Sequence, residues 1–484
     1  MYIVILIIIT LITILDLILT SRKDNYNLKR KSLYWSLFIA VYFNAMIILF
    51  KEKEGFQLNF LLDWININSN LNWGDLYLSI DGISIFFIEL SILLVPICIT
   101  MSWDSVKNLR KEFLICLFSI LLLLIGVFSI LDILGFYILF ESILIPMFLI
   151  IGIWGSREEK VKAAFYFFFY TLIGSLLMLI SIFKLYSVYG TTNYQNLVIL
   201  ELPSDLQIWL FLGFFASLSV KIPMIPFHIW LPQAHVEAPV AGSVLLAGIL
   251  LKLGGYGFIR FGYPIYPIAS EYFSPIIIII SLIAIVYGGL TTCRQNDIKR
   301  LIAYSSVSHM GLVTLAIFTH SVEGLIASII MMIAHGLVSS ALFMTSSVLY
   351  VRHHSRIIRY FRGITITMPI FSILSFILIL ANIGFPLTIN FIAEFFSILA
   401  SVNYSLVVGI ISCIGALLST VYALFYFNRI YFGTLSNHLK FSREIKEIEF
   451  QSFLPLLILT IILGVFPNFI INFFLTSSFI NISL

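Results

Sequence analysis

The chain has 484 residues, of which 60% are hydrophobic and only 11% are charged, and its mean hydropathy is +1.06. This composition excludes a soluble globular protein and predicts an all-α polytopic membrane protein. The formal net charge of +4 excludes little, because in a membrane protein the placement of charges is more informative than their sum.

The sequence contains no recognisable motif for a redox cofactor or a metal. We find no Gly-rich phosphate loop, no Rossmann fingerprint and no cysteine set for an iron–sulfur cluster. Cys98, Cys116, Cys293 and Cys413 are scattered in or beside apolar runs and indicate neither a disulfide nor a metal site. We therefore expect no cofactor and no metal on this chain.

Apolar windows predict fourteen transmembrane helices in a single membrane domain, residues 1–484, because about 20 apolar residues span a bilayer. The N-terminus has no basic n-region and no cleavage site, so it predicts a first membrane helix rather than a signal peptide. The Asn-rich connection 51–81 indicates an ordered surface loop. The predicted helices cover residues 2–19, 32–50, 82–101, 112–130, 132–153, 163–186, 206–229, 239–259, 274–291, 301–318, 324–349, 366–399, 405–428 and 453–474.

The basic residues support this helix count, because they collect in alternate loops, starting with the loop after the first helix, and of these loops only the one after the seventh helix holds none. The other loops hold only Lys51, Lys53 and Arg260, while Lys184, Lys221 and Lys252 fall inside predicted helices. We therefore expect both termini on the side opposite the basic loops. The 22 basic-loop residues are Arg22, Lys23, Lys29, Arg30, Lys31, Lys107, Arg110, Lys111, Arg157, Lys160, Lys162, Arg294, Lys299, Arg300, Arg352, Arg356, Arg359, Arg362, Arg429, Lys440, Arg443 and Lys446.

Two predicted helices carry breaks. The segment 206–229 contains Pro223 and Pro226, and the segment 366–399 is interrupted at Gly384 and Pro386. Interrupted backbone persists in a bilayer only where it lines a buried or wet cavity. Because the breaks lie five helices apart, the two helices run in opposite directions and predict an inverted repeat of the transporter type. We expect N-terminal helices in 1–110, repeats at 111–262 and 263–432, and a last helix in 433–484.

Six ionisable residues are predicted near the middle of the membrane. An ionised side chain there costs roughly 2.5 to 3.5 kcal/mol on insertion scales, so such residues usually face the protein interior and have a function. Together they form a candidate lateral proton path, because histidine titrates near neutrality and a desolvated lysine can lose its proton when a carboxylate withdraws. They are Glu141, Lys221, Lys252, His309, His335 and Glu394.

Structural roles remain open for several of these residues. His309 and His335 could be hydrogen-bonding helix-packing residues, and Glu141 could be only a counter-ion. His228 and His235 flank the connection between 206–229 and 239–259, where they could gate proton entry or simply cap it. Lys184 lies near a helix end and is expected to snorkel to the surface. Glu89 receives no assignment.

Four runs resemble the NADH dehydrogenase subunit 4 family, the antiporter-like membrane subunits of mitochondrial respiratory complex I. They are SVKIPMIPFHIWLPQAHVEAPVAGSVLLAGILLKLGGYG at 219–257, TTCRQNDIKRLIAYSSVSHMGL at 291–312, MMIAHGLVSSALF at 331–343 and IGFPLTINFIAEFF at 383–396. The resemblance covers about residues 80–430. The carboxylate at Glu394 is typical of this family, whereas the subunit 2 and subunit 5 relatives have lysine there.

The resemblance implies that Glu141, Lys221, Lys252, His335 and Glu394 fall on proton-transfer positions, with His309 on the central polar axis. It also implies that NADH, flavin, iron–sulfur clusters and the quinone pocket reside on other subunits. The expected partners are other complex I membrane subunits, including the subunit 2 and subunit 5 relatives, and lipids, without nucleic acid. The basic loops would face the mitochondrial matrix and the termini the intermembrane space.

Two other functions compete with this one. The first is a subunit of a multi-subunit cation/proton antiporter, because such subunits share this fold and the Glu-Lys-Lys pattern. The second is a structural spacer of the membrane arm, and the intramembrane charges argue against it because a spacer needs none. We further expect Glu141 and Lys221 to form a switchable ion pair that controls transfer to Lys252, and Glu394 to form the outer end of the path.

Overall fold

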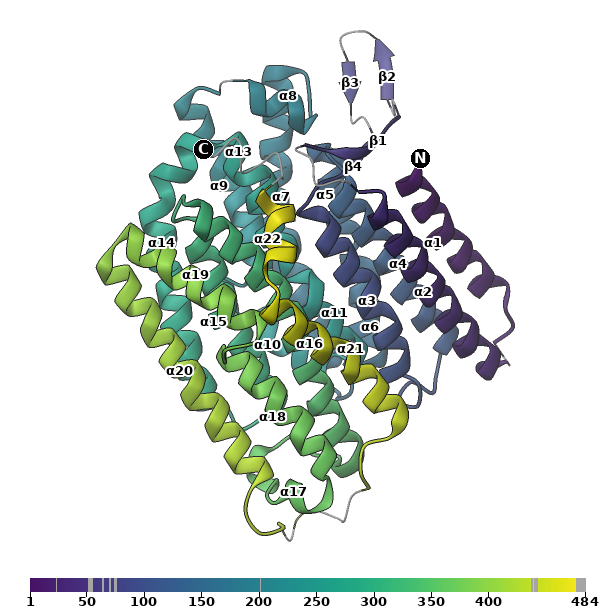
Figure 1. Cartoon of the computed structure of the whole chain (residues 1–484). Coiled ribbons are helices and arrows are strands. Elements are labelled where there is room, and N and C mark those ends of the chain that lie inside the picture. Colours follow the sequence, from purple (N-terminus) through teal and green to yellow (C-terminus); the bar gives the residue numbers. More distant parts are fainter. Residues whose placement is uncertain are drawn as a thin grey trace.

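The computed structural model describes residues 1–22, 24–50, 55–62, 65–68, 71–73, 76–200, 202–436, 438 and 443–475. Lys23, Lys51, Lys53 and Lys440 lie outside the described residues. The elements form a bundle of roughly parallel and antiparallel helices, with short strands at one end (Figure 1). The predicted all-α polytopic architecture is confirmed, since twelve helices of the described chain are long and apolar enough to span a membrane.

The N-terminal part consists of four helices and two small antiparallel sheets. The sheets pair β1 with β4 and β2 with β3, so part of the connection predicted as a surface loop is strand. The elements are α1 (Tyr2–Leu19), α2 (Asn25–Ile48), β1 (Gln57–Leu62), β2 (Ile65–Asn68), β3 (Leu71–Trp73), β4 (Leu76–Ile80), α3 (Ser84–Met101) and α4 (Arg110–Ser129).

The next part contains the first interrupted helix. α9 ends at Lys221, because Pro223 and Pro226 lack the N–H groups that a helix would need there. The elements are α5 (Ile133–Ser142), α6 (Leu144–Trp154), α7 (Lys160–Tyr189), α8 (Tyr194–Ile199), α9 (Ser204–Lys221), α10 (Trp230–Glu237), α11 (Val240–Leu245), the π-helix η1 (Leu246–Leu250), α12 (Lys252–Gly257), the π-helix η2 (Phe258–Gly262) and α13 (Tyr263–Ile265).

The last part contains the second interruption, between α18 and α19. Gly384 has φ +76°, its N–H donates to Ala381 O at 3.1 Å, and the N–H of Phe385 donates to Leu380 O at 3.1 Å, which is a Schellman termination. The elements are α14 (Pro267–Cys293), α15 (Ile298–Ile317), α16 (Val322–His353), the 3₁₀ turn η3 (Ile358–Tyr360), α17 (Ile364–Thr367), α18 (Pro369–Ile383), α19 (Ile389–Tyr404), α20 (Leu406–Tyr431), α21 (Glu447–Val465) and α22 (Asn468–Leu475).

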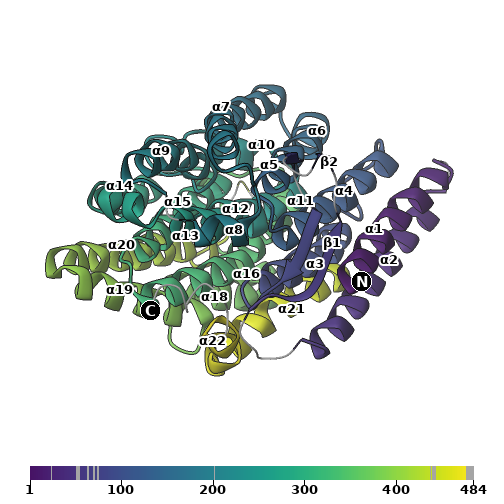
Figure 2. The same cartoon turned by 90° about the horizontal axis from the view of Figure 1, so that it is seen from above.

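α16 is the centre of the bundle. Seen from above, α1 and α2 lie at one edge, α14 and α20 at another, and α16 lies between them (Figure 2). Its membrane-spanning window is 94% buried, and it contacts α11, α12, α15, α18 and α19. Both its apolar and its polar side chains are buried over most of its length. Polar side chains on α16 are therefore held inside the protein.

The loops after α3, α6, α14, α16 and α20 meet at one end of the bundle. Arg157 pairs with Asp297 at 3.5 Å and Lys446 pairs with Asp104 at 3.0 Å. At the other end, Tyr42 Oη donates to the carbonyl of Tyr2. The rings of Phe86 on α3 and Phe473 on α22 lie 5.6 Å apart at the same end. The described parts of the basic loops thus lie at one end, and the start of α1 and the helix α22 lie at the other.

The prediction that Arg260 lies in an outer loop is wrong. The helix that begins with α11 continues through η2, where Arg260 is 2% exposed and forms a 2.6 Å ion pair with the fully buried Asp81. The guanidinium also lies over the rings of Phe56 and Tyr256. A buried charge requires such a partner, so this pair fixes η2 against the start of α3.

Candidate functional site

Lys252 and His335 form the closest contact among the six predicted intramembrane residues. Lys252 Nζ lies 2.8 Å from His335 Nδ1, and both side chains are at most 2% exposed. Lys252 Nζ also donates to the carbonyl of Ala247. The amine therefore lies within hydrogen-bond distance of the imidazole of α16 in a buried site, a geometry in which a proton could pass directly between the two groups.

The π-helical turn and glycines position Lys252. In η1 the hydrogen bond runs from residue i to i−5, as Leu251 N to Leu246 O at 3.3 Å shows. A Cβ at Gly254 would lie 2.9 Å from Leu218 O on α9, and one at Gly255 would lie 2.4 Å from the sulfur of Met332 on α16. Only glycine permits such approach, so Lys252 begins a helix wedged between α9 and α16.

His309 and Glu394 continue the row beyond His335. The rings of His309 and His335 have centroids 5.8 Å apart, and His309 Nδ1 lies 3.6 Å from Glu394 Oε1. Tyr422 Oη lies 3.5 Å from His309 Nε2. Since α15, α16 and α19 contact one another, the structure brings Lys252, His335, His309 and Glu394 into one buried row.

Glu141 and Lys221 form no ion pair of 4.0 Å or less, although Lys221 contacts Phe140, the residue that precedes Glu141. Neither carboxylate oxygen of Glu141 has a hydrogen-bond partner. Lys221 is 3% exposed, and its Nζ lies 4.2 Å from the centroid of the Phe140 ring. The amine is thus held by an aromatic face beside the carboxylate rather than by the carboxylate itself.

Lys221 and Lys252 are linked through their helices. α9 packs against α12. The close approach is between Gly254 of α12 and the backbone of Leu218, which lies one turn before Lys221 on α9. The six predicted residues therefore divide into a pair, Glu141 and Lys221, and a row of four, joined where α9 meets α12.

His228 lies in the turn between α9 and α10. It is 7% exposed, its Nδ1 has no hydrogen-bond partner, and its ring faces Tyr287 at 5.8 Å between centroids. This position lies beside the interrupted helix, where the sequence predicted either a gate or a cap, and among the described residues the His228 ring packs on Tyr287 and Tyr304.

Sequence reasoning missed Lys299 and left His235 undecided. Lys299, predicted in a basic loop, lies in the first turn of α15 and is only 3% exposed. Its Nζ donates to Ala238 O at 2.8 Å and to His235 O at 3.4 Å. His235 is fully buried and stacks on Phe343 at 4.5 Å, and both ring nitrogens lack partners. Asp297 was the available signal, because Asp is a typical N-cap residue and a helix that begins directly after it includes Lys299.

The carboxyl end of α10 is capped by cations, as its dipole favours. Arg356 donates to the carbonyl of Val236, and Ser156 N donates to Glu237 O at 3.0 Å. Burial raises the pKa of Glu237 above its ordinary value, and the charges of Arg157 and Arg356 oppose that rise. Burial also lowers the pKa of Arg356. These contacts fix the run HVEAP between the basic end and the buried row.

The chemistry of this arrangement is that of groups that exchange protons. It consists of amines, imidazoles and carboxylates in series, each able to accept and release a proton. Among the described residues, no cluster of three or more His, Cys, Asp or Glu side chains could hold a metal ion.

Residues 130–419 match the family model described as NADH:quinone oxidoreductase/Mrp antiporter, TM. The chain is 55% identical to NADH-ubiquinone oxidoreductase chain 4 of Metridium senile, over 95% of this chain and 94% of that relative. It is 47% identical to the protein of the same name from Chondrus crispus, over 90% of this chain and 89% of the relative. With the Arabidopsis thaliana protein the identity is 46%, covering 92% and 88%.

The fold is similar to that of a chain in the solved structure of respiratory complex I from Thermus thermophilus with bound NADH. The TM-score is 0.88 and the alignment covers 100% of both chains, at 24% sequence identity. At this level of identity the similarity concerns the fold.

Proposed function

Because this chain belongs to the NADH-ubiquinone oxidoreductase chain 4 family, we propose that it is a proton-translocating, antiporter-like subunit in the membrane arm of NADH:ubiquinone oxidoreductase, respiratory complex I. The observation that carries this function is the buried row of Lys252, His335, His309 and Glu394 inside a bundle of membrane-spanning helices. NADH, FMN, the iron–sulfur clusters and ubiquinone belong to other subunits, whose redox reaction drives the protons.

The proton moves laterally along the six residues. Glu141 holds Lys221 protonated when the two approach, and its withdrawal drives the proton to Lys252. From Lys252 it passes to His335 through their 2.8 Å contact. His309 and Glu394 then carry it to the break between α18 and α19, whose freed backbone groups water can satisfy.

The basic end is connected to the row through His235 and Lys299. Lys299 donates to the carbonyl of His235, and the buried His235 ring stacks on Phe343 of α16, the helix that carries His335. His228, beside the break after α9, is the second candidate gate. These groups provide the entry from the side of the basic loops.

The architecture of this mechanism is an inverted repeat. We assign the repeats to residues 111–262 and 263–432, after N-terminal helices in 1–110 and before a last helix in 433–484. The interruptions after Lys221 and Ile383 support it, because transporters of this type place their sites at broken helices in corresponding positions. The basic loops face the matrix of the mitochondrion, and the termini face the intermembrane space. The neighbours in the membrane arm are the subunit 2 and subunit 5 relatives.

A subunit of a cation/proton antiporter is the second candidate, because the description of the matched family model names both classes. The full-length similarity to three chain 4 proteins favours complex I. Identification of co-purifying chains separates the two, since only the complex I assembly contains NADH-oxidising subunits.

The Glu394→Gln variant tests the function. Glutamine preserves the size of the side chain but cannot carry the proton, so we expect an assembled complex that has lost proton pumping in reconstituted vesicles. Glu271→Gln is the control, because Glu271 is an exposed carboxylate on α14. Normal pumping by Glu394→Gln at unchanged turnover would show that the path ends elsewhere.

A further inference from the structure

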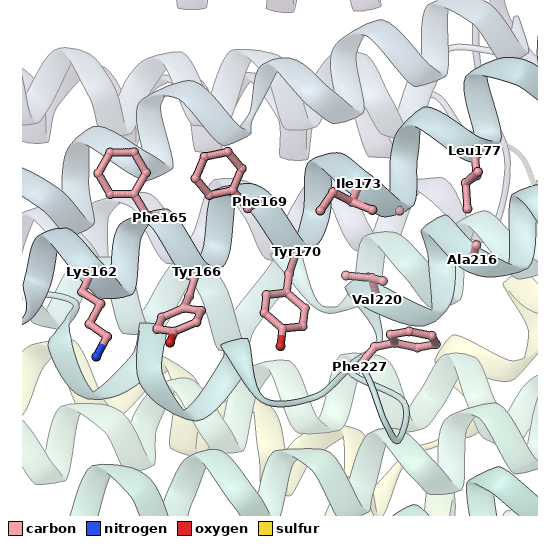
Figure 3. Close-up of a pocket in the computed structure, with 11 residues that line it drawn as sticks. Lys162, Phe165, Tyr166, Phe169, Tyr170, Ile173, Leu177, Ala216, Val220 and Phe227 are labelled. Carbon is pink, nitrogen blue, oxygen red and sulfur yellow. The ribbon is translucent and has the colours of Figure 1, made fainter.

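A long groove runs along the outer face of the bundle between α7 and the end of α9. Its volume is about 530 Å³. Phe165, Phe169 and Ile173 of α7 form one wall and are 44 to 64% exposed. Val220, from α9, and Phe227, from the turn after α9, complete the lining (Figure 3). This surface would contact lipid in a membrane-spanning bundle.

The polar groups of the groove lie in the half that is nearer the basic loops. Lys162, in the first turn of α7, lines it at the end where the basic loops gather. Figure 3 shows the Lys162 ammonium and the hydroxyls of Tyr166 and Tyr170 in a row on one side of α7. Lys162 forms no ion pair of 4.0 Å or less with any residue that the structure describes. The rest of the lining, as far as Leu177, is apolar.

We propose that this groove binds one anionic diacyl phospholipid, with its phosphate at Lys162 and an acyl chain along α7. At 1.5 Å per residue, the distance from Lys162 to Leu177 is about 22 Å. One leaflet, including its headgroup region, is about 20 to 22 Å thick. The groove thus matches a phospholipid in length, in polarity and in the sign of charge at the headgroup.

A transmembrane helix of another protein fits this groove less well. Helices approach each other closely through small residues, whereas the rim of the groove is formed by phenylalanine and isoleucine. The small residues beneath it are already used inside the chain, because a Cβ on Gly174 would lie 3.1 Å from Val220 Cγ2 and 3.2 Å from Ala216 O. A flexible acyl chain can follow such a surface.

The bound chain would touch the interrupted helix. Val220 precedes Lys221, and Phe227 belongs to the turn that contains Pro223 and Pro226. The lipid would therefore pack against the segment that holds Lys221, from the outside of the bundle. This inference requires only the membrane location of the chain and not its role in proton transfer.

Photolabelling of the purified complex tests the proposal. The complex is reconstituted into phosphatidylcholine vesicles that contain a trace of phosphatidylglycerol with a diazirine on its acyl chain, and adducts are mapped by peptide sequencing. We expect adducts on 165–177 and at Phe227, at least fivefold more than with the matching phosphatidylcholine probe. Lys162→Gln should remove this preference, Lys162→Arg should keep it, and Lys184→Gln, at the far end of α7, should leave it unchanged.

Three results would overturn the proposal. Equal labelling by the two probes in the wild-type complex would show an apolar groove without headgroup selection, and this comparison needs no variant to assemble. Cross-linking of 165–177 to another protein chain, without lipid adducts, would identify a subunit interface. Unchanged labelling in Ile173→Trp, which fills the groove, would place the lipid elsewhere.

Discussion

Lys252 and His335 share a buried site that suits one proton better than two. Their nitrogens lie 2.8 Å apart, and no carboxylate of the described chain lies within 4.0 Å of Lys252 Nζ. Two cations at that separation in a poorly solvated site would repel strongly. We therefore expect Lys252 and His335 to share a single proton, so that protonation of one favours the neutral form of the other.

In the proposed mechanism, the pair of Glu141 and Lys221 controls whether a proton reaches Lys252. We expect Glu141→Gln to lower both pumping and coupled NADH oxidation by about tenfold or more, because a lost interaction of about 1.4 kcal/mol corresponds to one factor of ten. Glu141→Asp should retain partial activity, since it keeps the charge. The measurements are proton pumping in vesicles and NADH:ubiquinone turnover, with the flavin-site reaction towards artificial acceptors as a readout that should not change.

Glu112→Gln provides the matched control for this prediction. Glu112 pairs with Arg22 at 2.5 Å on the surface of the basic end, and surface pairs contribute little. Wild-type pumping by Glu141→Gln would refute the switch and leave Glu141 as an unused carboxylate.

The sequence could identify the six intramembrane residues but not all of their neighbours. Glu141, Lys221 and Lys252 stand out because a charge inside an apolar run has few explanations. Lys299 does not stand out, because it lies at the edge of an apolar window. Its burial depends on tertiary contacts with the carbonyls of His235 and Ala238 at the end of α10. Arg260 was misplaced for a related reason, since only the tertiary partner Asp81 reveals that the helix continues.

At the scale of elements, the breaks were predictable and the π-helices were not. Pro223 and Pro226 predict an interruption from the loss of backbone donors alone. No single residue type predicts the π-helical turns η1 and η2. They lie on either side of α12, which packs against α9 and α16, so they depend on tertiary contacts. Hydropathy windows likewise could not predict the strand pairing within 51–81, because the pairing depends on register between distant residues.

Substitution of Gly384 tests whether the break between α18 and α19 is needed for pumping. The φ of +76° at Gly384 costs a residue with a Cβ about 1 to 2 kcal/mol, and an added Cβ would lie 2.5 Å from Glu394 Oε2. We expect Gly384→Ala to lower the thermal stability of the assembled complex and also to reduce pumping, because the carboxylate must move. Thermal unfolding and pumping are measured on the same preparation.

Gly190→Ala separates the two effects of this substitution. Gly190 has φ +67°, and a Cβ there would meet nothing within 4 Å. Gly190→Ala should therefore lower the thermal stability by a comparable amount, through backbone strain, while the complex pumps normally. If Gly384→Ala pumped as well as Gly190→Ala, the position of Glu394 against the break would be irrelevant to transport.

At the scale of the whole molecule, charge placement predicts orientation. The described basic loops meet at one end of the bundle, where Arg157–Asp297 and Lys446–Asp104 pairs form, and α1 begins at the other end beside Tyr42. Loops rich in Lys and Arg stay on the side from which a membrane protein is inserted. This side is the matrix for a chain of the mitochondrial inner membrane, so the exposed Arg359 and Arg362 should face the matrix and the N-terminus the intermembrane space.

Proteolysis from each side of the membrane measures this orientation. In mitoplasts, which expose the intermembrane-space face, we expect trypsin to spare the chain at Arg359 and Arg362 and an antibody to reach an epitope tag placed after Met1. In inverted membrane particles both results should reverse. Neighbouring subunits can shield the cleavage sites, so the tag provides the independent measurement, and detergent-solubilised complex shows whether each site is accessible at all. Antibody binding to the tag in inverted particles, but not in mitoplasts, would reverse the topology and with it the assignment of His235 and Lys299 to the matrix side of the proton path.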